Sequence, residues 1–179
     1  MTGTTQFDQT VADAEPAAAR ERTHAWVDPL ETARFGTGLS GMEFFAAMAE
    51  GRVSRSPIMS TLDFDGITFE EGHVEFRMTP REFHYNPLGS VHGGVFATLL
   101  DSACGCAVHT RLPAGASYTS LDLSVKFLRP VSVATGPVTA IGTVLHLGRR
   151  TALAEARLLD GEGRLCATAT SSCLVTRPE

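Results

Sequence analysis

The residues best suited to chemistry lie between Asn86 and Asp101. An amide, an imidazole, two glycines and a carboxylate occur within sixteen positions, as Asn86, His92-Gly93-Gly94 and Asp101. Asp101 is the only formally charged residue between Glu82 and Arg111. An ionised carboxylate in such apolar surroundings is costly unless it finds hydrogen-bond donors. This set combines a potential base with a potential electrophilic N–H group.

The glycine pair Gly93-Gly94 stands where a helix is expected to begin. The first backbone N–H groups of a helix have no partner within it and carry the positive end of its dipole. Glycine also lets a ligand approach the backbone closely. We therefore expect this helix end to polarise a carbonyl oxygen, a role in which one donor can contribute about 100-fold to 1,000-fold in rate.

Residues 93–110 read as one long helix with an unusual polar side. Large apolar residues cover more than half of its circumference. A solvated face would carry Lys, Glu or Arg, and this side carries none. The pattern predicts that it packs against protein; its residues are Thr98, Asp101, Ser102, Gly105 and His109.

The remaining elements should position this helix. A capping box from Ser40 to Glu43 and a stop at Gly51 predict a short helix, and residues 57–80 alternate as a hairpin that turns at Glu71-Gly72. After a loop over 83–89 and the long helix, four strand-like segments follow over 117–131, 136–148, 150–160 and 164–177. The order predicts an α+β fold in which a curved antiparallel sheet wraps the long helix. We expect residues 1–36 to form a flexible extension and residues 37–179 to form the single domain.

Composition excludes several classes of protein. The formal net charge of −5 argues against a general nucleic-acid binder. No apolar run is long enough to span a membrane, and the N-terminus lacks the pattern of a secretory signal, so we expect no membrane partner and a cytoplasmic location. The four cysteines lie in apolar segments and predict no disulfide framework.

Two other interpretations of these residues are weaker. Cys104, Cys106 and His109 could bind a metal, but the C-x-C step is not a usual zinc spacing. Ser90 with His92 could suggest a serine hydrolase, but no G-x-S-x-G elbow surrounds Ser90. We therefore predict no metal and no cofactor.

Three segments together resemble a known family. They are Asn86 with "VHGGVFATLLDSA" (91–103), "TSLDLSVKFLRPV" (119–131) and "GRRTALAEARLLDGEGRLCATATSSCLV" (148–175). They are similar to the hotdog-fold acyl-CoA thioesterases of the phenylacetate-pathway (PaaI-like) group, over roughly residues 39–175. The resemblance implies a hotdog fold and a homodimer with shared active sites, which usually pairs again as a homotetramer.

The resemblance also implies roles for individual residues. Asp101 would be a general base or a nucleophile that forms an anhydride, and the Gly93 N–H of the partner subunit would polarise the thioester carbonyl. Asn86 and His92 would position the thioester or its loop. Ser120 matches a position where some relatives orient the water, with Thr119 as the other candidate. Gly94, Arg149 and Arg150 match positions expected to bind substrate or the CoA phosphates. The two arginines could equally be a solvated pair at a turn.

Two alternatives to hydrolysis stay open at this point. Hotdog domains also serve as non-catalytic acyl-CoA sensors, although Asp101 and Asn86 together argue against that function. Hotdog hydratases and dehydratases use a differently placed Asp/His pair. The identity of the acyl group does not follow from these residues.

Overall fold

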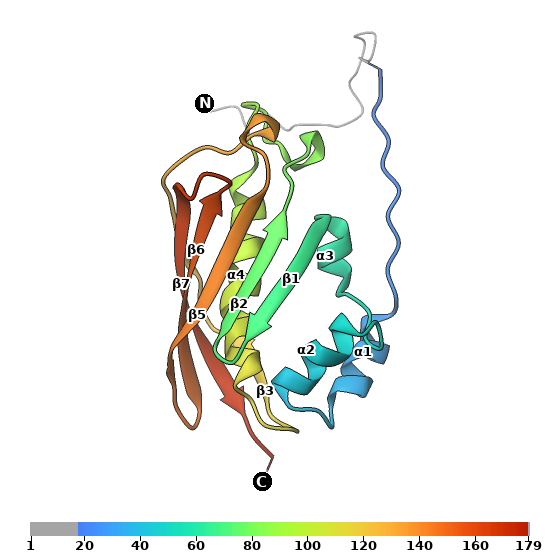
Figure 1. Cartoon of the computed structure of the whole chain (residues 1–179), viewed down its shortest axis with the longest axis vertical. Coiled ribbons are helices and arrows are strands. Elements are labelled where there is room, and N and C mark those ends of the chain that lie inside the picture. Colours follow the sequence, from blue (N-terminus) through green and yellow to red (C-terminus); the bar gives the residue numbers. More distant parts are fainter. Residues whose placement is uncertain (1–17, 179) are drawn as a thin grey trace, which may run out of the picture.

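The central feature of the computed structural model, which describes residues 18–178, is one long helix wrapped by a sheet (Figure 1). The helix is α4 (Gly93–Thr110). The strands are antiparallel in the order β1-β2-β5-β6-β7-β3, and β4 also pairs with β7. The predicted α+β class and the predicted bounds of the long helix are confirmed. The strands are β1 (Phe64–Glu70), β2 (His73–Met78), β3 (Ser117–Ser120), β4 (Ser124–Phe127), β5 (Val138–Leu147), β6 (Thr151–Asp160) and β7 (Leu165–Thr176).

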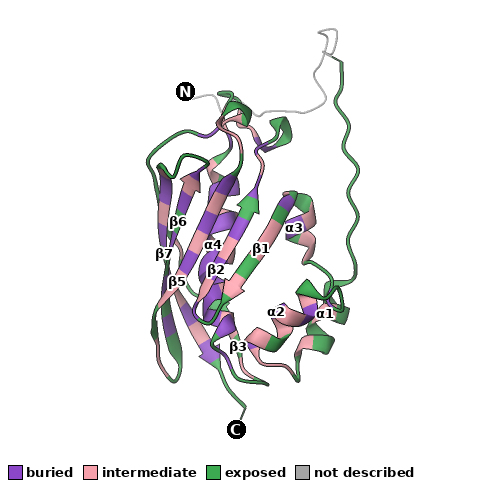
Figure 2. Cartoon of the chain, viewed as in Figure 1, coloured by how far each residue is buried: buried purple, intermediate pink, exposed green. Residues whose placement is uncertain are grey.

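The core lies between α4 and the concave face of the sheet, as the burial colours show (Figure 2). Strand β6 alternates strictly and buries Ala152, Ala154, Ala156 and Leu158. These mostly small side chains let the helix approach the sheet closely. At Gly142 of β5 the two are so close that a Cβ atom there would overlap the carbonyl group of Ala103. Close packing of this kind fixes the position of α4 on the sheet.

Three short helices precede the sheet: α1 (Pro29–Gly36), α2 (Gly41–Ala49) and α3 (Pro57–Thr61). The predicted capping box is present, because the Ser40 N–H donates to Glu43 and the Glu43 N–H donates to Ser40 Oγ. The Gly41 N–H donates to the carbonyl oxygen of Leu112 at 3.0 Å. A side chain at Gly41 would overlap the carbonyl oxygen of His109. Helix α2 is therefore docked directly on the C-terminal end of α4.

Two predicted elements differ from the structure. The strand expected to begin near Pro57 is wrong over its first residues, because Pro57–Thr61 forms α3 with proline at its first turn. The segment expected over 117–131 is divided into β3 and β4. Between them Asp122 bonds to β7 through side-chain contacts: its backbone carbonyl accepts from the Ser171 hydroxyl and its side chain accepts from the Ser172 N–H.

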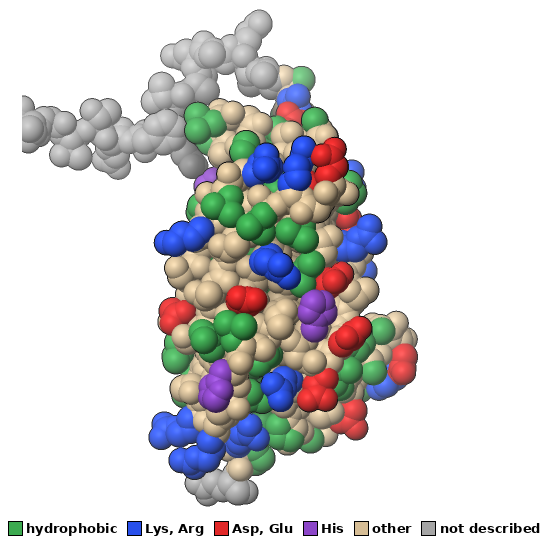
Figure 3. All heavy atoms as spheres, turned by 60° about the vertical axis from the view of Figure 1, so that its left-hand side comes forward, with side chains coloured by type: hydrophobic (Ala, Val, Ile, Leu, Met, Phe, Trp, Pro, Cys, Tyr) green, Lys and Arg blue, Asp and Glu red, His purple; other side chains and the backbone are tan. Residues whose placement is uncertain are grey.

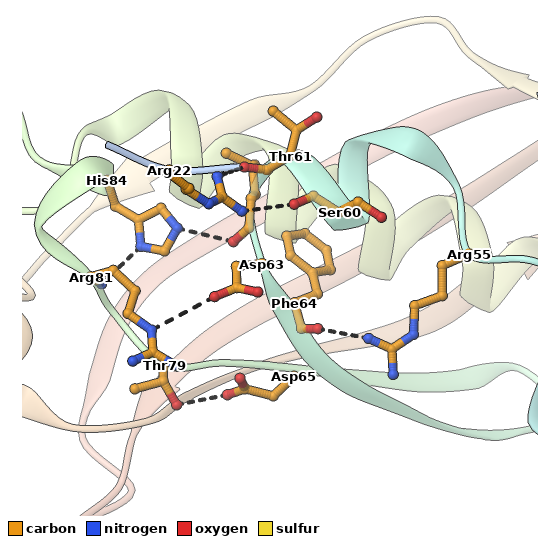
Figure 4. Close-up of polar contacts among 11 residues, drawn as sticks. Arg22, Arg55, Ser60, Thr61, Asp63, Phe64, Asp65, Thr79, Arg81 and His84 are labelled. Atoms are coloured by element: carbon orange, nitrogen blue, oxygen red, sulfur yellow. Dashed lines mark hydrogen bonds and ion pairs between the residues drawn. The ribbon is translucent and has the colours of Figure 1, made fainter. Parts of the chain in front are cut away.

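The segment before α1 contacts the domain through Arg22 (Figure 4). Its guanidinium donates to the carbonyl oxygens of Ser60 and Thr61 and lies 4.0 Å from the centre of the Phe83 ring. Residues 29–36, at the end of the predicted flexible extension, form α1. Residues 1–17 of that prediction lie outside the described residues. In the described part of the chain, no helix is long and apolar enough to cross a membrane.

Candidate active site

Asp101 lies in the middle of α4 with a single hydroxyl beside it. Its Oδ1 accepts a hydrogen bond of 3.0 Å from Ser120 Oγ at the end of β3. Of the two hydroxyls considered from the sequence, the one that reaches Asp101 therefore belongs to Ser120 and not to Thr119. The carboxylate is half-buried. A carboxylate oriented by one donor and partly shielded from solvent suits a general base or a nucleophile.

The thiols near Asp101 do not compete with it for these roles. Burial, followed by the charge of Asp101, raises the pKa of the Cys104 thiol to about 12. Burial also raises the pKa of the Cys106 thiol to about 12, and this outweighs the lowering by the neighbouring Tyr118 hydroxyl. The thiolate is the nucleophilic form of cysteine, so these side chains are inert near neutral pH. Among the described residues, no group of His, Cys, Asp and Glu is arranged to hold a metal ion.

The N-terminal end of α4 is built around His92. His92 is the N-cap, and its Nδ1 accepts from the Gly94 N–H at 2.8 Å. The His92 N–H donates to the carbonyl oxygen of His84 at 2.8 Å. Among the described residues the Gly93 N–H has no hydrogen-bond partner. The structure thus leaves one amide at this helix end available to an acceptor from outside the chain.

Asn86 shapes the loop that leads to this helix end. Its Oδ1 accepts from the N–H groups of Leu88 and Ser90, at 2.8 Å and 3.3 Å, and its Nδ2 donates to Ser90 Oγ. Gly89 has a φ of +81° in the same turn, a conformation that favours glycine. Within one chain, Asn86 orders the loop and does not contact Asp101.

A surface hollow of about 410 Å³ lies outside the Gly93 end of the helix. Phe127 and Leu128 form part of its wall and are 57% and 58% exposed. These exposed apolar side chains therefore lie next to the unpaired Gly93 amide.

The two chemical features of α4 are far apart within one chain. Gly93 and Asp101 are separated by eight positions of a continuous helix. At a rise of about 1.5 Å per residue they lie roughly 12 Å apart along the axis. A single thioester carbonyl cannot contact both. The structure therefore brings Asp101 and Ser120 together, but it does not bring Asn86, His92 or Gly93 of the same chain to them.

The polar side of α4 faces a cavity of about 420 Å³ that begins at Asp101. The prediction that this side packs against protein is confirmed for its C-terminal half. The resemblance implied a partner subunit there, but the covering elements are α1, α2 and β3 of the same chain. The cavity is lined from α4 by Asp101, Ser102, Gly105, Cys106 and His109, and from the covering helices by Thr32, Phe44, Phe45 and Met48.

The two predicted arginines lie together with a third at the end of the sheet. Arg149 and Arg150 form the β5–β6 turn, and Arg177 donates from Nε to the carbonyl oxygen of Arg149 at 3.3 Å. The three line a hollow of about 560 Å³. Figure 3 shows blue side chains gathered at the lower end of the molecule, close to the C-terminus. Arg177 was missed from the sequence, because only the pairing of β7 with β6 brings it to this turn.

Comparisons with known proteins agree with this architecture. The thioesterase superfamily model matches residues 88–167. The proofreading thioesterase EntH of Klebsiella pneumoniae is 31% identical over 99 residues, which cover 55% of this chain and 71% of that protein. The chain belongs to the thioesterase superfamily.

Solved structures extend the likeness to the hotdog fold. The PaaI protein of the E. coli phenylacetic acid degradation operon aligns with a TM-score of 0.65 at 24% identity, over 79% of this chain and 96% of that chain. A Streptococcus mutans protein bound to acetyl-CoA aligns with a TM-score of 0.58 at 26% identity, over 65% and 90%. The predicted PaaI-like hotdog fold is confirmed. Family membership supports a hydrolase that acts on thioesters.

Proposed function

We propose that this protein hydrolyses an acyl-CoA thioester to a free acid and CoA, in active sites shared by two copies of the chain. The observation that carries the proposal is the separation of roughly 12 Å between Gly93 and Asp101 on one helix. One chain holds a base without an electrophile close to it, and an electrophile without a base. A second copy supplies the missing half to each site.

In the proposed reaction, Asp101 removes a proton from a water molecule that the Ser120 hydroxyl helps to orient. The water oxygen attacks the thioester carbon while the partner's Gly93 N–H stabilises the developing oxyanion. The C–S bond then breaks, and the CoA thiolate leaves and takes up a proton. In the alternative route Asp101 attacks the carbon directly, and water hydrolyses the resulting anhydride. Asn86 and His92 hold the loop and the helix end in position for either route.

Two surfaces support assembly and substrate binding. The outer edge of β3 and β4 has no strand partner among the described residues, and the exposed Phe127 and Leu128 lie beside it. Pairing of this edge would form the dimer, and the exposed Leu153 on the outer face of β6 is available for a tetramer.

The phosphates of CoA would bind to the cluster of Arg149, Arg150 and Arg177, since a chain of net negative charge needs a local positive patch for a polyanion. One structural neighbour was solved with acetyl-CoA bound.

The test is release of free thiol from a panel of acyl-CoAs by the purified protein. We expect Asp101→Ala and Asp101→Asn to lower kcat/KM by at least about 100-fold, as expected when a catalytic base is removed. The matched control is Asp65→Asn, an exposed carboxylate of β1 that bonds Thr79, which should keep the rate. Unchanged rates in both Asp101 variants would contradict the role of Asp101. Tight binding of acyl-CoA without turnover by the unmodified protein would favour the sensor, and addition of water to an enoyl-CoA without thiol release would favour a hydratase.

A further inference from the structure

The cavity that begins at Asp101 runs along α4 toward His109. Its residues on α4 fall at helical spacing, so they form one stripe that follows the axis for about two turns, or roughly 12 Å. The roof is provided by α1 and α2, which lie outside the region matched by the family model. A volume of about 420 Å³ lies within the usual range for small-molecule sites.

His109 is the polar group at the far end of this cavity. Its ring packs against Phe44, Phe45 and Tyr118, with ring centres 5.2 Å, 5.4 Å and 5.7 Å away. None of the described residues forms a hydrogen bond with its nitrogens. No buried side-chain nitrogen or oxygen in the described part of the chain lacks a partner. The His109 nitrogens therefore border open space, where a ligand or water can reach them.

The surroundings of His109 define which polar group it can receive. Burial lowers the pKa of His109, so the ring is neutral near pH 7 and offers one donor and one acceptor. The lining of the cavity contains no Lys, Arg or Glu among the described residues, and Asp101 stands at the opposite end. An acidic acyl terminus would find no cation here. An uncharged hydroxyl would satisfy the ring.

Tyr118 of β3 lines the cavity and lies against α4 at Gly105. A Cβ atom at Gly105 would lie 2.7 Å from the Tyr118 ring, so glycine is what allows the ring to lie against α4. A second cavity of about 480 Å³ begins at the same place and shares His109, Tyr118 and Phe44 with the first. The His109 imidazole therefore lies where the cavity that begins at Asp101 meets a second hollow. The far end of an acyl chain bound in the first cavity would contact it there.

We propose that His109 selects acyl groups that carry a hydroxyl about two helical turns away from the thioester carbon. The proposal rests on the proposed function, because Asp101 fixes the position of the thioester. The apolar walls bind the chain, and the imidazole exchanges a hydrogen bond with its hydroxyl end. A purely apolar chain of the same length displaces water from the imidazole without replacing its hydrogen bond, which costs affinity.

The test compares two pairs of substrates that differ only in a terminal hydroxyl. We expect the acyl chains of octanoyl-CoA and omega-hydroxyoctanoyl-CoA to reach His109, and those of butanoyl-CoA and omega-hydroxybutanoyl-CoA to be too short. We expect a preference of roughly threefold to tenfold in kcat/KM for the hydroxylated member of the long pair, the effect of one hydrogen bond between neutral groups. The short pair should show no such preference.

Variants then assign the preference to one side chain. His109→Phe keeps an aromatic ring of similar size and should abolish the preference, while His109→Gln keeps a donor and an acceptor and should retain part of it. His73→Phe, on the face of β2 opposite the core, is the matched control and should behave as the unmodified protein. Thermal unfolding temperatures establish that the variants are folded.

The possible outcomes separate this inference from the proposed function. If no acyl-CoA releases thiol, the proposed function fails. If octanoyl-CoA is hydrolysed but the hydroxyl makes no difference, only the role of His109 fails. A preference that persists in His109→Phe, or that is equally large in the short pair, would also overturn it.

Discussion

The two halves of helix α4 are built for different surroundings. The N-terminal half ends at Gly93, whose amide has no partner among the described residues and faces a hollow walled by exposed Phe127 and Leu128. The C-terminal half, from Asp101 to His109, is covered by α1 and α2 of the same chain. The N-terminal half borders a surface hollow. Asp101 also lines an open hollow with Thr98 and Ser120, and beyond it the helix is roofed by elements of its own chain.

This difference suggests how the work is divided in the proposed dimer. Each chain encloses an acyl cavity beside its own Asp101, and each offers its helix end to its partner. Substrate preference would then depend on elements within one chain, such as α2 and His109. Catalysis would depend on two chains. Substitutions in the N-terminal half of α4 should therefore lower catalysis, whereas substitutions in the C-terminal half should alter substrate preference.

The largest effect is expected at the open end of the helix. Gly93 is the first residue of α4, where proline is tolerated, and His92 has φ −63° and ψ 138°, which a following proline accepts. Gly93→Pro therefore removes the N–H with little change to the helix. We expect kcat to fall by about 100-fold to 1,000-fold, the usual cost of losing one oxyanion donor. Thiol release from acetyl-CoA and octanoyl-CoA measures the loss, which should be similar for both.

Gly93→Ala is the matched control for this variant. An added Cβ atom would lie 3.1 Å from the ring of Phe127, whose exposed side chain can move. Because alanine keeps the N–H, its kcat should fall far less than that of the proline variant. Equal losses of kcat in the two variants would show that the added side-chain atoms, and not the loss of the N–H, cause the effect.

A smaller effect is expected on the pH dependence of stability, through one histidine near each half of α4, His84 and His109. His84 supports the open end: its Nδ1 accepts from the Arg81 N–H, its Nε2 donates to the Leu62 carbonyl oxygen, and its own carbonyl receives the His92 N–H (Figure 4). Burial is the main cause that lowers the pKa of His84, and burial also lowers the pKa of His109. Below the pKa of an unfolded histidine, about 6.5, the unfolded chain binds more protons, so the free energy of unfolding decreases as pH falls toward the lowered folded values.

Protonation affects the two rings differently. It removes the Nδ1 acceptor that His84 presents to Arg81, whereas His109 has no such bond to lose among the described residues. We expect the unfolding temperature to fall between about pH 7 and about pH 5, and to fall less in His84→Gln than in His109→Gln. An identical pH dependence in all three proteins would show that neither ring contributes.

The sequence predicted helix α4 and its bounds well, for physical reasons that are local. Helix α4 has a clear periodicity, glycines at its start and a single carboxylate, and each of these signals lies within one segment. The capping box at Ser40 and Glu43 is also local and is present. The partner of Asp101 could be narrowed to Ser120 or Thr119, but the choice depends on the pairing of β3 with β7.

The features that escaped prediction depend on contacts distant in sequence. Nothing near α1 indicates that it covers a cavity beside Asp101, because that contact follows from the docking of Gly41 on the far end of α4. Arg177 joins Arg149 only through the sheet. The roles of the individual site residues, the division at residues 36 and 37, the assembly and the cytoplasmic location stay predictions.

The most direct test of the shared site mixes two inactive chains. Gly93→Pro and Asp101→Asn subunits are unfolded together and refolded, so that half of the dimers contain one of each, and each mixed dimer has one site with both groups intact. We expect the mixture to recover about a quarter of the activity of the unmodified protein. Mixing either variant with the double variant should recover nothing. If the mixture of single variants also stays inactive while mixed dimers are detected, the base and the electrophile do not come from two chains, and the central claim is contradicted.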